Sequence, residues 1–370
     1  MNILHVGYLD PYTNHGGVER YIFNLVSSFH KKYQLKSDII CAASEYGRKA
    51  RDYGDVISLK VPFKNIPGSY PVSKYLYSIK IKKYLEKETK EYDVLHFHGD
   101  NGSISKGLGT KSVLTLHGIA RDDSSIWKRI YSAPLSHIEK NNVRNAAKIF
   151  SMTLEAREFF KKYTINDIKL IKQSIDTDFY QPVNYEEKIA IRKSLGIPLD
   201  RIVGVITGRD PVRKGLNIAV KALELLRKEN ILLIAIGFPQ NYVTNERVKF
   251  TGNIDEFTKL RFLQSADFFI FPSAKEGFPI SVLEAAAVGL PLIVSKYSYA
   301  NELKECVPYF NEVDSLEPEK YSEALNEYIE YYHQTRGRYL KPQVDCISEY
   351  SISNTAGIYF KAYSEVMSTL

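Results

Sequence analysis

Two glutamates, Glu276 and Glu284, lie eight positions apart in a stretch whose spacing favours ligand binding. Pro279 suits the start of a helix because it lacks an N–H, so Glu276 is predicted in a strand-to-helix turn and Glu284 in the second helical turn. Free N–H groups at a helix start suit an anionic ligand. Glu284 stands among apolar residues, where a carboxylate needs donors such as the hydroxyls of a ribose. The pair predicts a sugar-nucleotide site.

Two cations flank a short loop that follows a predicted strand over residues 201–207. Arg209 begins this loop, and Lys214 stands at the start of the next predicted helix. Two positioned cations and a helix N-terminus can neutralise a departing nucleoside diphosphate without a metal ion. The alternative is that both cations face water, as most lysines and arginines do. Arg213 is a weaker candidate for the same role.

Three histidines lie on or after predicted strands of the first half. His117 follows the apolar strand 112–116 and precedes a glycine, so it should emerge at the carboxyl end of that strand and reach a transferred sugar. His98, at the end of strand 93–97, is a candidate for contact with an acceptor, whereas His96 is predicted to be core. A purely structural histidine is the alternative reading for His117.

A pair of glycines, Gly16 and Gly17, joins the first strand to the first helix. Glycine allows positive φ and close approach of the backbone to a ligand, so the pair could form the floor beneath a donor phosphate or an acceptor. Without a third glycine at the dinucleotide spacing it is no nicotinamide fingerprint. A plain tight turn is the alternative.

These segments together resemble the GT-B-fold retaining glycosyltransferases of family 4. The acidic pair, the glycine loop Gly16–Arg20, the segment 114–118 around His117, and Gly208-Arg209 with Lys214-Gly215 match four family motifs in the family's order. The resemblance extends over nearly the whole chain. It implies a hexose transfer that uses a UDP- or GDP-sugar donor, a glycan or lipid-linked acceptor, no cofactor and no metal ion.

The resemblance also implies roles for individual residues. The catalytic set would be His117, Glu276, Arg209 and Lys214, with Glu276 on the donor sugar and Glu284 on the ribose. The loop 252–254 would pack on the nucleobase. The donor-binding set would be Gly16, Gly17, Gly208, Arg209, Lys214, Gly252, Asn253, Ile254, Glu276, Gly277, Phe278, Pro279, Ile280, Leu283 and Glu284.

One segment departs from the family pattern. Gln173-Ser174 stand where the family has Asn-Gly, which puts the hinge geometry in doubt. The neighbouring Asp176-Thr177-Asp178 spells the Asp-x-Asp of metal-dependent glycosyltransferases with another fold, and we treat that match as coincidence.

The elements that position these residues alternate between short apolar strands and amphipathic helices in both halves of the chain. This alternation predicts an α/β fold with two Rossmann-like, doubly wound parallel-sheet domains, whose ligands lie in the cleft between them. We expect an acceptor-binding domain over 1–175 and a donor-binding domain over 176–352, with a charged linker near 173–200. The resemblance implies that the C-terminal helix, 353–370, packs back on the first domain.

The charge of the chain is unevenly distributed. The net charge is +7, but residues 1–185 carry 28 Lys and Arg against 19 Asp and Glu, and residues 186–370 carry 22 against 24. A basic first half suits anionic lipid, nucleic acid or a phosphorylated acceptor, or it is simply well solvated. No nucleic-acid-binding module is recognisable, so we expect no nucleic acid partner.

A basic, aromatic stretch over residues 70–90 has two interpretations. It could lie on an anionic membrane, or pack its apolar side on the first sheet while its lysines meet water. The N-terminus lacks a signal peptide and no apolar run is long enough to span a bilayer, so we expect a cytoplasmic protein, either free or associated with the membrane. Three sparse cysteines fit a reducing compartment, and a Cys306–Cys346 bridge stays open.

The function predicted from these features is metal-independent hexose transfer with retention at the anomeric carbon. Two alternatives stay open. A sugar-nucleotide epimerase could share the fold, although it would need acid–base groups on both sides of the sugar. A non-catalytic sugar-nucleotide-binding subunit of a glycan-assembly complex could keep the same binding residues.

Overall fold

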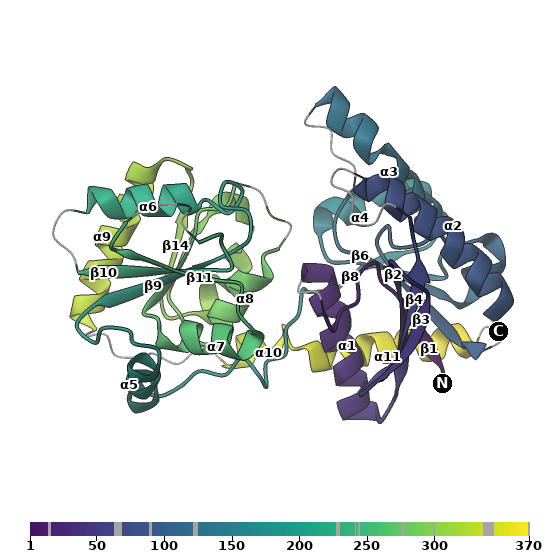
Figure 1. The fold of residues 1–370 in the computed structure, drawn as a ribbon, viewed down its shortest axis with the longest axis horizontal. Helices are drawn as coiled ribbons and strands as arrows, with labels where there is room; N and C mark the ends of the chain where they lie inside the picture. Colours follow the sequence, from purple (N-terminus) through teal and green to yellow (C-terminus); the bar gives the residue numbers. More distant parts are fainter. Residues whose placement is uncertain are drawn as a thin grey trace. The chain divides into compact units, whose positions relative to one another are not determined.

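The computed structural model describes residues 1–370 except 14–15, 63–68, 89–90, 121–124, 227–229, 241, 243–244, 275, 277, 299, 336–343 and 369–370. The chain divides into two compact units (Figure 1). The first unit contains residues 1–174 and 351–370, and the second contains residues 175–350. Each unit is an α/β fold around its own sheet, which confirms the predicted fold class.

The first unit is built on an eight-stranded sheet with strand order β3-β4-β2-β1-β5-β6-β7-β8. All neighbouring strands are parallel except β3 and β4, which form an antiparallel edge that the sequence did not predict. Its strands are β1 (Ile3–Val6), β2 (Ser37–Ala43), β3 (Gly47–Arg51), β4 (Gly54–Lys60), β5 (Val94–His98), β6 (Ser112–Leu116), β7 (Lys148–Ser151) and β8 (Ile168–Leu170). Its helices are α1 (Gly17–Tyr33), α2 (Tyr70–Glu88), α3 (Ile126–Asn145), α4 (Leu154–Phe160) and α11 (Ile352–Ser368), with short 3₁₀ turns η2 (Lys106–Lys111) and η3 (Lys161–Tyr163).

The second unit is built on a six-stranded parallel sheet with strand order β11-β10-β9-β12-β13-β14. Its strands are β9 (Ile202–Thr207), β10 (Ile231–Ile236), β11 (Val248–Gly252), β12 (Phe268–Phe271), β13 (Leu292–Ser295) and β14 (Phe310–Val313). Its helices are α5 (Tyr185–Ser194), α6 (Leu216–Leu225), α7 (Glu256–Ser265), α8 (Ile280–Ala287), α9 (Pro318–Gln334) and α10 (Val344–Ser348), with 3₁₀ turns η4 (Lys296–Ser298) and η5 (Asn301–Cys306).

Each sheet changes winding direction once. The crossovers run one way from β1 and the other way from β5, and likewise from β9 and β12. In the second unit β9 pairs with β10 from Ile202↔Ile231 to Thr207↔Ile236, and with β12 through Gly204↔Phe268 and Val205↔Phe269. Ligands of doubly wound sheets bind outside the carboxyl ends of the strands at such switch points. These two edges are therefore where functional side chains should gather.

The predicted linker over residues 173–200 is wrong, because it contains α5. Asn184 and Glu187 form a capping box that starts this helix. Lys188 and Arg192 are buried, and each bonds a different carboxylate oxygen of Asp267 at 2.6 Å. In the sequence these two cations look like the charged residues of an exposed linker, because their partner Asp267 is 75 or more residues away.

The C-terminal helix α11 belongs to the first unit, where it packs on α1. Its buried Tyr359 and Tyr363 contact side chains of β5 and β6. The Tyr363 hydroxyl lies 2.6 Å from His96 Nδ1, and the Tyr359 hydroxyl lies 2.6 Å from Thr115 Oγ1. The histidine strands of the first unit are thus anchored by hydroxyls from the far end of the chain.

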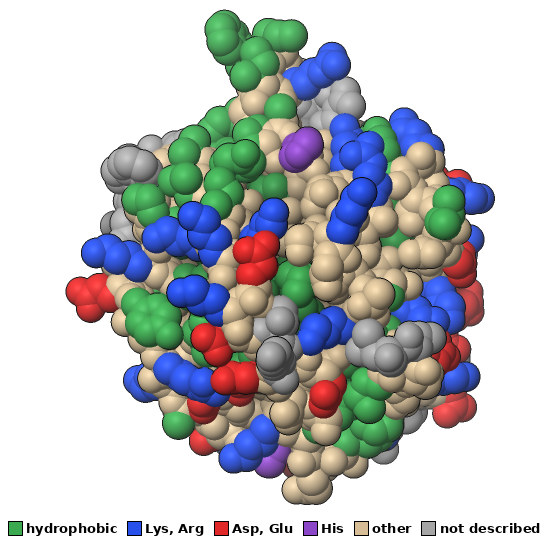
Figure 2. Space-filling model, turned by 90° about the vertical axis from the view of Figure 1, so that its right-hand side faces the viewer, with side chains coloured by type: hydrophobic (Ala, Val, Ile, Leu, Met, Phe, Trp, Pro, Cys, Tyr) green, Lys and Arg blue, Asp and Glu red, His purple; other side chains and the backbone are tan. Residues whose placement is uncertain are grey.

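The first turns of α3 extend beyond the rest of the first unit (Figures 1 and 2). Residues 125–131 are all exposed, whereas the helix becomes buried on one side from Ser132 onwards. Among the described helices, none combines the length and the apolar content needed to cross a bilayer.

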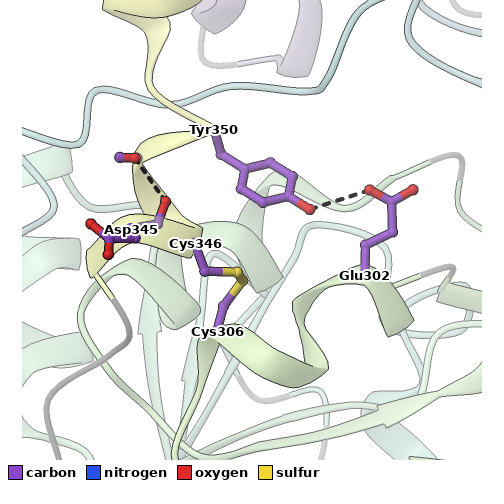
Figure 3. Close-up of a disulfide and its surroundings, with 6 residues drawn as sticks. Glu302, Cys306, Asp345, Cys346 and Tyr350 are labelled. Carbon is purple, nitrogen blue, oxygen red and sulfur yellow. Dashed lines mark hydrogen bonds between the residues drawn. A yellow bond between two sulfur atoms is a disulfide. The ribbon is translucent and has the colours of Figure 1, made fainter.

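The sequence left open whether Cys306 and Cys346 are bonded, and the structure pairs them. Cys306 of η5 and Cys346 of α10 form a disulfide, with a Cα–Cα distance of 5.3 Å (Figure 3). Tyr350, which follows α10, donates a hydrogen bond to Glu302 at 3.2 Å and stacks on Phe278. The bridge thus fastens α10 to the body of the second unit.

The disulfide predicts a measurable stabilisation of the second unit. Closing a loop of sequence separation 40 should raise its free energy of unfolding by about 4 kcal/mol in the chain-entropy model. Protein purified without reductant should show one reactive thiol after unfolding, Cys41, and dithiothreitol should lower the denaturant midpoint. In Cys346→Ser the reductant should have no effect. Three reactive thiols in the untreated protein would contradict the bridge.

Candidate active site

The loop after β9 is shaped by its own backbone contacts. Asp210 Oδ1 accepts hydrogen bonds from the backbone N–H groups of Val212 and Arg213, at 3.1 and 3.0 Å. Gly215 has φ of +72°, and a side chain there would collide with the carbonyl of Pro272. Gly208 has no room for a Cβ either, since that atom would lie 2.7 Å from Lys214 Cγ. These constraints fix where the Lys214 side chain leaves the loop.

Lys214 and Glu276 meet at the carboxyl edge of the second sheet. Lys214 Nζ lies 2.7 Å from Glu276 Oε1, and the same oxygen receives Arg213 Nη1 at 3.1 Å and Ser273 Oγ at 2.8 Å. Loops after β9 and β12, the two strands at the switch point, supply all these groups. The structure therefore brings together two of the predicted catalytic residues across 62 positions of sequence.

The charges around Lys214 suit the binding of an anion. Burial lowers the pKa of Lys214, and the charge of Glu276 counteracts that effect. Lys214 Nζ also lies 4.8 Å from the centre of the Phe271 ring, a cation–π contact. The lysine is held in place by a carboxylate that can also accept hydrogen bonds from sugar hydroxyls. Arg213 is half exposed and can swing toward a ligand.

Arg209 does not join the Lys214–Glu276 pair in this structure. Its side chain is exposed, and within the described part of the chain it makes no ion pair or hydrogen bond. The weaker candidate, Arg213, is the arginine that reaches Glu276. Sequence order alone could not separate the two, because both belong to the same short loop.

The start of α8 lies beside this pair. The helix begins at Ile280, one position later than predicted, so Pro279 is the residue before it. No side chain caps the helix. The first N–H groups of α8 are therefore available to an anion, as expected from the sequence. Phe278 is half-buried and stacks on Tyr350, with ring centroids 5.9 Å apart. Gly277 lies outside the described residues.

Glu284 is buried and already has partners within the chain. Its Oε1 accepts from Lys259 Nζ at 2.9 Å and from the Tyr180 hydroxyl at 3.0 Å. Tyr180 and Lys259 also bond Glu256, at 2.6 and 2.9 Å. Burial raises the pKa of Glu284, and the Lys259 charge opposes that shift. The need for ribose hydroxyls, inferred from apolar neighbours in sequence, is thus met in part by Lys259 and Tyr180, which the sequence analysis missed.

The remaining donor-set residues have mixed surroundings. Gly252 adopts φ of +65° and its carbonyl accepts from the Gly237 N–H, while Asn253 is exposed and Ile254 packs on the core. Ile280 is partly buried against the same core. The Leu283 side chain is fully buried there, so it contributes to packing and has no exposed surface for a ligand.

The Asp-x-Asp match has a structural explanation. Asp176 Oδ1 accepts from the backbone N–H groups of Asp178 and Phe179, each at 3.2 Å, and so stabilises a local turn. Gln173 and Ser174, just before it, are buried.

The first unit has its own cavity, of about 280 Å³, at the carboxyl ends of β5 and β6. It is lined by Gly17, Val18, Glu19, Tyr70, Lys74, His98, Gly99, Asp100, Asn101, His117, Gly118, Ile119, Ala120 and Glu139. Both predicted histidines, His98 and His117, are there, and so is Gly17. A larger depression of about 880 Å³ lies between α2, η2 and α3, and no predicted site residue lines it.

Gly16 precedes α1 with φ of −69°, so it does not use the positive φ that glycine allows. Instead a Cβ at this position would collide with the Glu19 carboxylate. Because that carboxylate is the end of a flexible side chain and can move aside, the structure shows no strict need for glycine at this position.

Three charged residues of this cavity were not predicted. Lys74 Nζ lies 2.5 Å from Asp100 Oδ1, and both side chains are largely buried. Burial alone would lower the pKa of Lys74, but Asp100 and Tyr70 outweigh it and raise that pKa. Glu139, from α3, accepts a hydrogen bond at 2.9 Å from the N–H of Ala120, in the loop that carries His117. Burial, followed by the Asp100 charge, raises the pKa of Glu139 to about 8.

A line of hydrogen-bonded histidines crosses the sheet to His117. His98 Nδ1 lies 3.1 Å from His117 Nε2, and His98 Nε2 lies 3.3 Å from His5 Nδ1. Burial lowers the pKa of all three, to about 3 for His5 and His117, so each ring is neutral and carries one N–H. His5 Nε2 is buried without a partner.

The direction of this chain follows from the unpartnered atom. A buried N–H without an acceptor costs more than a buried lone pair, so His5 Nε2 should be the lone pair. His5 Nδ1 then donates to His98, and His98 Nδ1 donates to His117 Nε2. His117 must therefore carry its proton on Nδ1. It lines the cavity as a hydrogen-bond donor.

His5, His96 and His98 also form the one group in the described chain whose ligand atoms lie close enough for a metal ion, within 4.8 Å of one another. The sequence pattern alone does not predict this cluster. Both nitrogens of His96 and of His98 already have hydrogen-bond partners, and no carboxylate belongs to the cluster. We assign it the role of orienting His117.

Two family descriptions match the chain. "Glycosyltransferase Family 4" matches residues 15–179, and "Glycosyl transferases group 1" matches residues 187–336. A putative teichuronic acid biosynthesis glycosyltransferase of Bacillus subtilis is 29% identical over 208 residues, covering 54% of this chain and 52% of that protein. An Escherichia coli UDP-Gal:alpha-D-GlcNAc-diphosphoundecaprenol alpha-1,3-galactosyltransferase is 23% identical over 267 residues, covering 64% and 67%. The chain thus matches about half of the length of the first of these relatives.

Solved structures share the fold over the full chain. Sucrose-phosphate synthase from Thermosynechococcus elongatus superposes with a TM-score of 0.77 at 16% identity, covering 100% of both chains. Anabaena HepE, in complex with UDP and glucose, superposes with a TM-score of 0.70 at 17% identity, covering 98% of this chain and 99% of that one. These likenesses confirm the GT-B fold expected from the sequence.

Glu139 predicts a pH dependence of stability. Its carboxyl is protonated in the folded state up to about pH 8 but ionises near pH 4.5 when unfolded, so it stabilises fully below pH 4.5 and loses that effect as the pH rises through 8. Glu139→Gln should remove this contribution. Between pH 5 and 8 the difference in unfolding free energy between wild type and variant should change by up to about 3 kcal/mol in denaturant titrations. A difference that is independent of pH would contradict the assignment.

The histidine chain predicts one tautomer for His117. In ¹⁵N-histidine-labelled protein, long-range ¹H–¹⁵N correlation spectra should show His117 Nδ1 protonated and Nε2 unprotonated. His117→Asn identifies the signal, and exposed His137 gives the reference for an unconstrained ring. His98→Phe should release His117 into a mixture of tautomers. A protonated Nε2 in the wild type would reverse the proposed direction.

Proposed function

We propose that this chain, which belongs to glycosyltransferase family 4, the group 1 glycosyltransferases, transfers a hexose from a nucleoside-diphosphate sugar to a glycan or lipid-linked acceptor, with retention. The observation that supports this most directly is the Lys214–Glu276 pair beside the uncapped start of α8. It joins a fixed cation, a carboxylate and free backbone N–H groups at the switch point of a doubly wound sheet.

The second unit would hold the donor. Lys214, with Arg213 or Arg209 from the same loop, would neutralise the diphosphate, and the N–H groups of α8 would bind its oxygens. Glu276 would exchange part of its contact with Lys214 for sugar hydroxyls. Within the described residues all hydrogen bonds to Glu284 end on Oε1, which leaves Oε2 for a ribose hydroxyl.

The chemical step would break the bond between the anomeric carbon and the diphosphate oxygen. The two cations stabilise the charge that develops on the leaving diphosphate. The acceptor hydroxyl attacks from the same face, and its proton passes to the departing phosphate. This route needs neither a metal ion nor a covalent enzyme intermediate. His117 would donate its Nδ1 proton in a hydrogen bond to a donor-sugar oxygen and so orient the ring.

The first unit would bind the acceptor in the cavity beside His117. Lys74 is the one lysine among the described residues that line this cavity, and it is already paired with Asp100. Glu19 and Glu139 also line the cavity. A cavity with this many carboxyl groups should bind a neutral sugar with hydroxyl groups more readily than a phosphate. A lipid-linked acceptor, like the diphosphoundecaprenol derivative in the name of the Escherichia coli relative, would place its sugar here and its charged group elsewhere. We expect the reaction to take place in the cytoplasm, at the membrane surface.

Removing the cation or the carboxylate should strongly slow the transfer reaction. Lys214→Ala and Glu276→Gln should each lower kcat/KM by about 10²–10³-fold in a transfer assay, the usual cost of losing one stabilising group at developing charge. The donor for this assay comes from thermal-shift measurements with UDP-, GDP- and ADP-sugars, in which the true donor raises the apparent stability.

The matched control is Lys221→Ala, which removes an exposed lysine of α6 and should retain full activity. A donor that stabilises the wild type without any transfer would favour the non-catalytic alternative. Conversion of the donor sugar without acceptor would favour the epimerase. Full activity of Lys214→Ala would overturn the proposed role of the pair.

A further inference from the structure

Residues 125–131, which form the start of α3, are all exposed, and we call this segment the α3 tip. Four large apolar side chains are exposed on it: Ile126 by 64%, Trp127 by 77%, Ile130 by 59% and Tyr131 by 49%. Trp127 is the single tryptophan of the chain. Figure 2 shows hydrophobic side chains projecting at this end of the molecule. Soluble surfaces seldom present such a group without a binding partner.

The apolar side chains of the α3 tip lie on one face. At about 100° per residue, positions 126, 127, 130 and 131 span an arc of about 140°, and Lys128 and Arg129 follow about 60° beyond either edge. Helices of this type, with aromatic and aliphatic residues between cations, lie at membrane interfaces.

The α3 tip stands away from the neighbouring helix. Lys74 near the start of α2 lines the same cavity as Glu139, so α2 runs alongside the part of α3 from Glu139 onward. Pro134 lies inside α3 between the tip and this packed part. Proline removes a helical hydrogen bond, which weakens the coupling between the two segments.

We propose that the α3 tip inserts into the interface of an anionic lipid bilayer and docks the first unit there. Charge supports this partner, because residues 1–174 carry 28 Lys and Arg against 17 Asp and Glu. A unit with this surplus is drawn to anionic lipid, and the apolar face of the tip then enters the headgroup region. The attraction to anionic lipid comes from the charge of the whole unit and does not depend on Lys128 or Arg129 alone.

A second copy of the chain is a weaker occupant. Four side chains are far fewer than the roughly 20–30 residues per side of a stable protein interface. The stretch that the sequence suggested for membrane contact, α2, is also weaker. Its Tyr77, Ile81 and Leu85 are buried in the core of the first unit, and its Lys74 is paired with Asp100 inside the cavity.

Tryptophan fluorescence tests the proposal directly, because all of it arises from Trp127. The full chain is titrated with vesicles of phosphatidylglycerol and phosphatidylcholine, and with phosphatidylcholine alone. The emission should shift to the blue with anionic vesicles only, and lipids brominated near the headgroup should quench it. Ile126→Ser combined with Ile130→Ser keeps the reporter and should weaken vesicle binding at least about tenfold.

The matched control is Val72→Ser combined with Ile79→Ser, which removes two exposed apolar side chains from α2 and should change binding less than about twofold. Vesicle binding without a change in Trp127 emission would overturn the proposal, since another surface would then carry it. A blue shift that depends on protein concentration in the absence of lipid would overturn it in favour of a second copy. Since no donor or acceptor is present, this outcome is independent of the proposed transfer reaction.

Discussion

The reversal of strand order beside β9 is the constraint on which the candidate donor site depends. Parallel strands deliver their carboxyl ends to one edge, and at the reversal the loops after β9 and β12 turn away to opposite faces. The edge between them stays open, so Lys214 and Glu276 can meet there although 62 positions separate them. The first sheet repeats this geometry at β1 and β5, where the histidines and the cavity lie.

Carboxylates with little exposure then fix the positions of α5 and of several lysine side chains. Asp267 ties α5 to the sheet, Glu276 holds Lys214, Glu284 holds Lys259, and Asp100 holds Lys74. Buried ion pairs often contribute little net stability, because desolvation offsets the attraction, but each fixes the geometry of both partners. At the candidate site this matters more than stability, since a cation must be in place before the diphosphate leaves.

Local spacing determined what the sequence could reveal. Glu276, the loop cations and His117 lie in segments that follow predicted strands and contain glycine, and Glu284 lies in the helix that follows Pro279, so their positions could be predicted from neighbours in the chain. Partners from distant segments could not be predicted in this way. Lys259 and Tyr180 reach Glu284 over 25 and 104 positions, and Glu139 looks like an ordinary glutamate of an amphipathic helix. That Arg213 contacts Glu276 while Arg209 is exposed likewise depends on the path of the loop.

One helix connects the two proposed functions of the first unit. α3 presents its apolar tip at Ile130 and its buried carboxyl at Glu139, nine residues later, which is about 14 Å along the axis. Glu139 holds the N–H of Ala120 in the loop of His117, so the helix also fixes the wall of the cavity. If the tip lies in the headgroup region, the cavity lies a short distance above it. Under the two proposals, the sugar of a lipid-linked acceptor would reach His117 while its lipid and phosphate stay at the bilayer, outside a cavity that is rich in carboxyl groups.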